Sequence, residues 1–141
     1  MIETKKSETQ RALSIDTAKS LEEVEPFLWI ERNLKVLTKQ RTISPFILNE
    51  AQIALYRRYR QALIDGRPFR ACVPKFRQGG VSTLCSALAF EQFCNRPGTT
   101  VSVLAHKEPA AKNLFSIPKR FFRLMKDAPA LEASSRLEMI A

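Results

Sequence analysis

The sequence has few of the residues that metal centres, disulfide frameworks and membrane spans require. Its 141 residues include one histidine and three cysteines, Cys72, Cys85 and Cys94, an odd number without zinc-ligand spacing. We therefore predict reduced thiols in a cytoplasmic protein, with no disulfide framework and no zinc site. No apolar run reaches the length of a transmembrane helix, and the N-terminus lacks the apolar segment of a signal peptide, so no membrane partner is expected.

Positive charge is what the chain has in excess. Lysine and arginine number 23 against 14 aspartates and glutamates, which gives a formal net charge of +9. Such an excess favours an anionic partner, nucleic acid or nucleotide, although it says nothing about the fold. The length allows one domain at most. We predict a flexible polar tail over residues 1–19 and a folded part over residues 20–141.

A strand, a glycine turn and a helix start are predicted between Phe69 and Thr83. Residues 69–73 are mostly apolar and β-prone, and a proline follows them. Gly79 and Gly80 give the turn access to positive φ and leave its backbone uncovered by side chains. A run of good helix formers comes next. Because the first N–H groups and the dipole of a helix attract anions, the sequence predicts a phosphate site here.

The loop departs from the usual P-loop pattern, G-x-x-x-x-G-K-[ST], at two positions. Val81 stands where the lysine is expected, and Lys75 stands where the first glycine is expected. The spacing from Lys75 to Gly80 and Ser82 is kept, and a lysine at the front of the loop can still reach the β- and γ-phosphates. The Ser82 hydroxyl is placed to ligate Mg²⁺, with Thr83 as the alternative ligand. A plain strand–turn–helix with two glycines is the competing interpretation.

This loop resembles the variant Walker A motif of large terminase subunits, the ATP-driven DNA-packaging motors of tailed phages. The residues that carry the resemblance are Lys75-x-Arg77-Gln78-x-Gly80-x-Ser82-Thr83. Upstream, residues 45–52 resemble the segment that leads into the family's adenine-contacting glutamine. Downstream, residues 99–106 and 109–115 resemble its next strand and helix. The match runs from about Phe27 to about Leu124, and the order and spacing of the three pieces make it specific.

The resemblance implies an α/β fold, a partial P-loop NTPase-type parallel sheet flanked by helices, and a site for ATP and Mg²⁺. The implied cofactor-binding residues are Gln52, Lys75, Arg77, Gln78, Gly79, Gly80, Val81, Ser82 and Thr83, with Ser82 as the metal ligand. Intact members of the family couple ATP hydrolysis to the translocation of double-stranded DNA into a procapsid. Their partners are a small terminase subunit, a portal protein and further copies of the large subunit in a ring.

One departure from the family concerns hydrolysis. The family has an apolar Walker B strand that ends in adjacent acidic residues, and no such strand follows Leu104. The family's C-terminal nuclease domain is absent too. Hydrolysis needs a carboxylate that holds the metal and orients water. We therefore expect the front part of a terminase, truncated before Walker B, with weak nucleotide binding and little or no ATPase activity of its own.

Gln52 has two interpretations. Asn49 is a good N-cap for a helix predicted from Glu50 to Ile64 and ended by Gly66, and Gln52 lies three residues after that cap. The spacing predicts a capping box, in which the glutamine side chain serves the helix start. The resemblance favours an adenine contact, for which the amide offers one donor and one acceptor.

The remaining elements follow from periodicity and turn residues. A first helix is predicted with a capping box at residues 20–23, Pro26 at an early position, Phe27, Ile30 and Leu34 at helical spacing and Trp29 as a packing residue on the rim. Residues 34–41 could continue this helix, whereas the resemblance favours an extended piece there with a turn at 39–42. The later predicted elements are a helix over residues 82–94, a strand over residues 100–105, a helical stretch over residues 108–126 that Pro118 breaks or kinks, a loop over residues 127–135 and a third strand begun at residues 136–141. Strand, helix and strand in this order predict a βαβ unit.

A second hypothesis is a non-enzymatic, basic nucleic-acid-binding module. The helix at residues 50–64 interleaves Tyr56 and Tyr59 with Arg57, Arg58 and Arg60. Mixtures of aromatic residues and arginine suit nucleic acid, although a solvated helix face with half-buried tyrosines is the favoured interpretation. A later stretch carries Lys119, Arg120, Arg123 and Lys126, with Phe121, Phe122 and Leu124 between them. A surface face over a core stripe is favoured there, and a DNA-facing or subunit-facing patch is the alternative.

Overall fold

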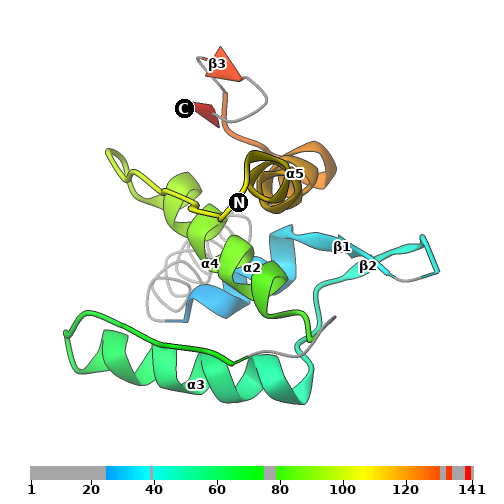
Figure 1. Ribbon diagram of the computed structural model, residues 1–141. Helices are drawn as coiled ribbons and strands as arrows, with labels where there is room; N and C mark the ends of the chain where they lie inside the picture. Colours follow the sequence, from blue (N-terminus) through cyan, green and yellow to red (C-terminus); the bar gives the residue numbers. More distant parts are fainter. Residues whose placement is uncertain (1–24, 39, 75–78, 131–132, 135–138, 141) are drawn as a thin grey trace, which may run out of the picture.

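The computed structural model describes residues 25–38, 40–74, 79–130, 133–134 and 139–140. Within these ranges the chain is a mixed α/β structure of four helices and two small antiparallel sheets (Figure 1). The elements in chain order are α2 (Pro26–Asn33), β1 (Lys35–Leu37), β2 (Ile43–Pro45), α3 (Glu50–Ile64), α4 (Val81–Asn95), α5 (Glu108–Leu124), β3 (Ala133–Ser134) and β4 (Met139–Ile140). The predicted tail and the predicted capping box at residues 20–23 lie outside these ranges.

Helix α4 is the centre of the packing, because it contacts α2, α3 and α5 (Figure 1). Its buried apolar residues are Leu84, Ala87, Leu88 and Phe90. A helix that is apolar around most of its circumference is stable only when other elements cover it. Aromatic rings extend this core outward: Phe121 of α5 lies with its ring centre 6.0 Å from that of Phe90 and 6.3 Å from that of Phe46.

Helix α2 begins with Pro26 in its first turn, as predicted, since a proline there needs no N–H partner. The rim position predicted for Trp29 was wrong, whereas the packing role favoured for it is confirmed. Trp29 is 8% exposed and belongs to the core, with its ring centre 6.5 Å from that of Phe90. Helical periodicity placed it at the rim of one face, but α2 packs against α4 broadly enough to cover that rim as well.

The extended piece predicted after α2 forms a hairpin. Strands β1 and β2 pair antiparallel, with Val36 opposite Ser44 and Leu37 opposite Ile43. The turn is closed by Thr38 and Thr42, whose hydroxyl oxygens lie 2.7 Å apart. Arg41 takes the positive φ (61°) that such a tight turn needs. The extended piece and the turn were expected, but their antiparallel pairing was not.

Helix α3 has the predicted bounds. Asn49 is its N-cap, and Gly66, with φ of 63°, lies just past its end. The N–H of Arg67 donates to the carbonyl of Ala62 at 3.0 Å, which closes the last turn. The chain then turns back along α3 (Figure 1), where the Phe69 ring meets the Tyr59 ring edge-on at 5.5 Å.

The structure corrects the prediction of two parallel strands. Neither residues 70–73 nor residues 100–105 pair as a strand within the described parts of the chain, so the predicted βαβ unit is not formed. Val73, Val101, Val103 and Leu104 are exposed there. A β-prone segment becomes a strand only when another strand supplies the hydrogen bonds of its ladder. The coarser class, mixed α/β, holds.

Two corrections concern the C-terminal third. The predicted helical stretch is α5, which continues through Pro118 to Leu124, so of the predicted break or kink the break does not occur and the kink stays a prediction. Phe121, which is 2% exposed and packs against both Phe90 and Phe46, anchors the turn after the proline and outweighs its missing hydrogen bond. In the segment predicted as a third strand, residues 139–140 form β4. They pair antiparallel with β3, which lies inside the predicted loop.

Candidate functional site

The candidate site is the glycine turn at the start of α4. Gly80 is the N-cap of α4 and adopts the left-handed conformation, with φ of 74° and ψ of 1°. Its carbonyl accepts the hydrogen bond from the N–H of Leu84 at 3.0 Å, the first bond of the helix. A glycine cap offers no side chain to the first N–H groups of α4, and the first turn contains no acidic residue. This end of the helix therefore keeps the positive character of its dipole.

Two side-chain amides from the start of α3 hold this turn. Asn49 Nδ2 donates to the carbonyl of Gly79 at 3.3 Å, and Gln52 Nε2 donates to the carbonyl of Gly80 at 2.8 Å. Gly79 is buried, and Gln52 is 3% exposed. These two hydrogen bonds connect the start of α3 to backbone atoms of the predicted phosphate loop, across sequence separations of 30 and 28 residues.

The same two residues form the predicted capping box of α3. Asn49 Oδ1 accepts from the N–H of Gln52 at 3.0 Å, and Gln52 Oε1 accepts from the N–H of Asn49 at 2.9 Å. Each amide therefore uses its oxygen for its own helix and its nitrogen for the turn before α4. An adenine base would have to compete with these partners for Gln52, so the adenine contact stays a prediction.

The approach of Gln52 to Gly80 leaves no room for a side chain at Gly80. A Cβ atom there would lie 2.7 Å from Gln52 Nε2 and 3.2 Å from Asn49 Nδ2. Positive φ and this close approach both favour glycine. By contrast, a Cβ atom at Gly98, which has φ of 75°, would meet nothing within 4 Å.

The structure brings together part of the predicted site. Gln52, Gly79, Gly80, Val81, Ser82 and Thr83 lie around the start of α4, and Ser82 and Thr83 are partly buried in its first turn. Lys75, Arg77 and Gln78 lie outside the described residues. Asn49 was recognised from the sequence only as a cap, because its contact with Gly79 depends on the packing of α3 against α4. The sequence feature that points to Asn49 is its position three residues before Gln52.

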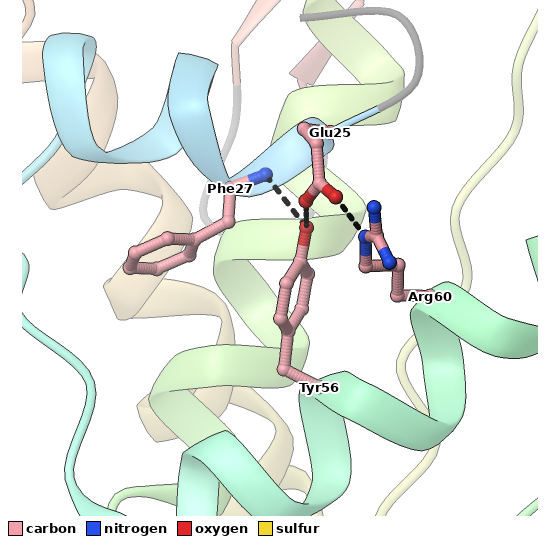
Figure 2. Close-up of polar contacts among 4 residues, drawn as sticks. All are labelled: Glu25, Phe27, Tyr56 and Arg60. Carbon is pink, nitrogen blue, oxygen red and sulfur yellow. Dashed lines mark hydrogen bonds and ion pairs between the residues drawn. The ribbon is translucent and has the colours of Figure 1, made fainter.

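A separate polar cluster joins α2 to α3 (Figure 2). The Tyr56 hydroxyl donates to Glu25 Oε2 at 3.0 Å and accepts from the N–H of Phe27 at 3.2 Å, and Arg60 forms an ion pair with the same carboxylate. Burial raises the pKa of Tyr56, so its hydroxyl stays neutral. Tyr56 and Tyr59 are thus core residues, while Arg57 and Arg58 are exposed. The arrangement fits a solvated basic helix face over buried tyrosines.

The arginines of helix α5 face solvent while its aromatic side chains pack inward, which is the interpretation favoured from the sequence. Phe121 is buried, Phe122 and Leu124 are partly buried, and Arg120 and Arg123 are exposed. The ammonium of Lys119 lies 5.4 Å from the centre of the Phe115 ring. His106, also exposed, follows the unpaired segment 100–105.

Buried ionisable groups lie where α4 faces α3. Glu91 is 5% exposed; its Oε1 accepts from Asn95 Nδ2 at 3.1 Å, and its Oε2 is buried without a hydrogen-bond partner in the described structure. Burial raises the pKa of Glu91. Burial, aided by the Glu91 charge, also raises the pKa of Cys94 to about 12. Such a thiol is a core group rather than a nucleophile.

Comparisons of the chain with protein-family models, curated proteins and solved structures found no match. Within the described ranges there is no cluster of three or more histidine, cysteine, aspartate or glutamate side chains arranged to bind a metal ion. None of the described helices has the length and apolar character needed to cross a membrane.

Proposed function

We propose that this chain is the ATP-binding part of a viral DNA-packaging motor of the terminase large-subunit type. In the intact protein that part would couple ATP hydrolysis to the movement of double-stranded DNA into a procapsid. The observation that carries the proposal is the glycine turn: Gly80 opens α4 in the left-handed conformation, with no side-chain cap and no acid in the first turn. Backbone N–H groups at such a helix start bind phosphate.

The roles of the side chains follow from the sequence around this turn. Lys75 would hold the β- and γ-phosphates, and Arg77 would support them or sense the γ-phosphate. The N–H groups of residues 79–82 would cradle the phosphates, and the Ser82 hydroxyl would ligate Mg²⁺. An adenine contact by Gln52 is an alternative role, because it would require the amide to leave its present partners. In the intact protein, residues 70–73 and 100–105 would pair as parallel strands beside α4.

Nucleotide binding is tested by the melting temperature with and without millimolar Mg·ATP. Binding to the folded state alone raises the melting temperature in proportion to the logarithm of ligand concentration over Kd. We expect a rise for the wild type and none for Lys75→Ala. Lys126→Ala, an exposed lysine past the end of α5, is the matched control and should behave as the wild type. A wild type that Mg·ATP leaves unmoved contradicts the proposal.

The second candidate, a basic nucleic-acid-binding module, is favoured by the exposed arginines of α3 and α5. Arg57, Arg58, Arg120 and Arg123 all face solvent. This function predicts that ATP has no effect and that Lys75→Ala weakens DNA binding only slightly. Arg120→Ala with Arg123→Ala should weaken DNA binding and make its salt dependence shallower, because each lost phosphate contact lowers the slope by about one.

A further inference from the structure

We propose that Asn49 and Gln52 are positioning residues that aim the backbone N–H groups of the glycine turn toward a bound phosphate chain. This inference rests on the proposed nucleotide site and goes beyond it, because it gives Gln52 a role other than reading adenine and adds Asn49 to the site. It starts from two hydrogen bonds: Asn49 Nδ2 to the carbonyl of Gly79, and Gln52 Nε2 to the carbonyl of Gly80.

The argument uses the planarity of the peptide group. The described chain contains no cis peptide bond, so the C=O and N–H of each peptide unit point in opposite directions. Asn49 draws the carbonyl of Gly79 toward α3, which turns the N–H of Gly80 away from α3. Gln52 fixes the carbonyl of Gly80 in the same way and turns the N–H of Val81 away. Two amides on one helix thus orient two consecutive donors.

The turn needs such a restraint because two glycines in sequence are conformationally free. Their peptide planes rotate at little steric cost, so an unrestrained turn would present a carbonyl to an anion in part of its population. Gly80 has no side chain of its own to hold it, and the space its Cβ would take is filled by the Gln52 amide. A site whose donors are already oriented binds more tightly, because less ordering remains to be done on binding.

The capping box makes the positioning amides rigid. The oxygens of Asn49 and Gln52 are fixed by each other's backbone N–H groups, at 3.0 and 2.9 Å, and this leaves their nitrogens aimed at the turn. The first turn of α3 therefore acts as a clamp on residues 79–80. We call these two side chains the amide clamp.

Two substitutions remove the clamp and keep the cap. In Asn49→Asp the carboxylate still accepts from the N–H of residue 52, and in Gln52→Glu it still accepts from the N–H of Asn49, as capping boxes commonly do. Both lose the N–H that reaches the turn. Asn49→Ser loses the donor amide without adding charge, since serine is also a good cap. Ala54→Glu, on the exposed face of α3, is the control for an added negative charge.

The first measurement is hydrogen exchange without ligand. For Asn49→Asp, Asn49→Ser and Gln52→Glu we expect the amide of Leu84, whose N–H donates to the carbonyl of Gly80, to exchange about fivefold faster or more, the scale of one lost hydrogen bond. The Ala54→Glu control should exchange as the wild type does. Unchanged exchange of the Leu84 amide in the clamp variants overturns the inference, whether or not the chain binds nucleotide.

The second measurement compares Mg·ATP with Mg·tripolyphosphate, which has no base. A clamp that orients phosphate donors predicts that each variant weakens both ligands equally, by about five- to tenfold for one lost hydrogen bond. Loss of ATP affinity with tripolyphosphate affinity unchanged would mean that Gln52 reads adenine and would overturn the inference. If the wild type binds neither ligand while the exchange result holds, the proposed function fails and the amide clamp stands as a structural restraint.

Discussion

Among single residues, Gly80 is under two constraints that can be separated by experiment. An alanine at this position must adopt left-handed φ. Its Cβ would lie 2.7 Å from Gln52 Nε2 and would push that atom away. Gln52 can move, because the atom is the end of a flexible side chain, but it then loses its hydrogen bond to the Gly80 carbonyl. Gly98 has nearly the same φ and open space around it, so it carries the first constraint alone.

We expect Gly80→Ala to lower the free energy of unfolding more than Gly98→Ala does. Left-handed φ costs an alanine about 1–2 kcal/mol at either position, and the lost hydrogen bond adds about 1 kcal/mol at Gly80. Urea unfolding of both variants measures the difference. In a Gln52→Ala background the difference should narrow to what the contact with Asn49 Nδ2, 3.2 Å from that Cβ, still costs. Equal costs in the wild-type background would mean that the Gln52 contact contributes nothing.

Glu91 makes stability depend on pH. Its pKa is raised by burial, and the groups around it are Tyr56 and Tyr59 on α3, and Cys94 and Arg96 at the end of α4. The folded state therefore keeps the Glu91 proton to higher pH than the unfolded chain, whose carboxyl titrates near its ordinary value of 4.5. The contribution of Glu91 to the free energy of unfolding falls as the pH rises from that value through the raised folded pKa.

We expect Glu91→Gln to be more stable than the wild type above this window, by about 1 kcal/mol, because no buried oxygen has to carry a charge without a partner. Below the window the two proteins should be equally stable, since both are then neutral at this position. Unfolding midpoints from pH 4 to pH 8 test this. Glu108→Gln, a fully exposed carboxyl paired with Lys112, is the control and should not gain stability at high pH. A Glu91→Gln profile parallel to the wild type would contradict the expectation.

Between elements, the parts fixed by neighbouring residues were predictable and those fixed by distant partners were not. The bounds of α3 followed from Asn49 and Gly66, and the extended piece after α2 was expected, although its antiparallel pairing was not. The strands expected at residues 70–73 and 100–105 had the right composition but needed partners that local sequence does not supply. Trp29 was misplaced for the same kind of reason, because its burial depends on how α2 meets α4.

The candidate site divides in the same way. The glycine turn and the helix start at Val81 could be found from Gly79, Gly80 and the helix formers that follow. The capping box could be found from the spacing of Asn49 and Gln52. Their hydrogen bonds to the turn could not, since they arise from the packing of α3 against α4. The amide clamp therefore became visible only in the structure, from the hydrogen bonds between the start of α3 and the glycine turn.

In the molecule as a whole, an apolar segment between α4 and α5 is exposed to solvent. Val101 and Val103 are each 41% exposed and Leu104 is 93% exposed, in a stretch without charge from Thr99 to Ala105. No strand in the described residues pairs with it. Unpaired β-prone backbone beside apolar side chains is a template for association with other chains. We therefore expect the isolated chain to self-associate or to depend on a partner.

Sedimentation velocity over a range of concentrations tests this expectation. The wild type should form larger species as concentration rises, and Val101→Lys with Val103→Lys should remain monomeric, because charges on the segment oppose pairing of like strands. Leu28→Lys with Ile64→Lys adds the same charge at exposed apolar positions of α2 and α3, 41% and 54% exposed, where the backbone is already hydrogen-bonded within helices. This control should associate as the wild type does. A wild type that is monomeric at every concentration contradicts the expectation, and suppression by the helix control alone would move the association surface from residues 99–105 to the helices.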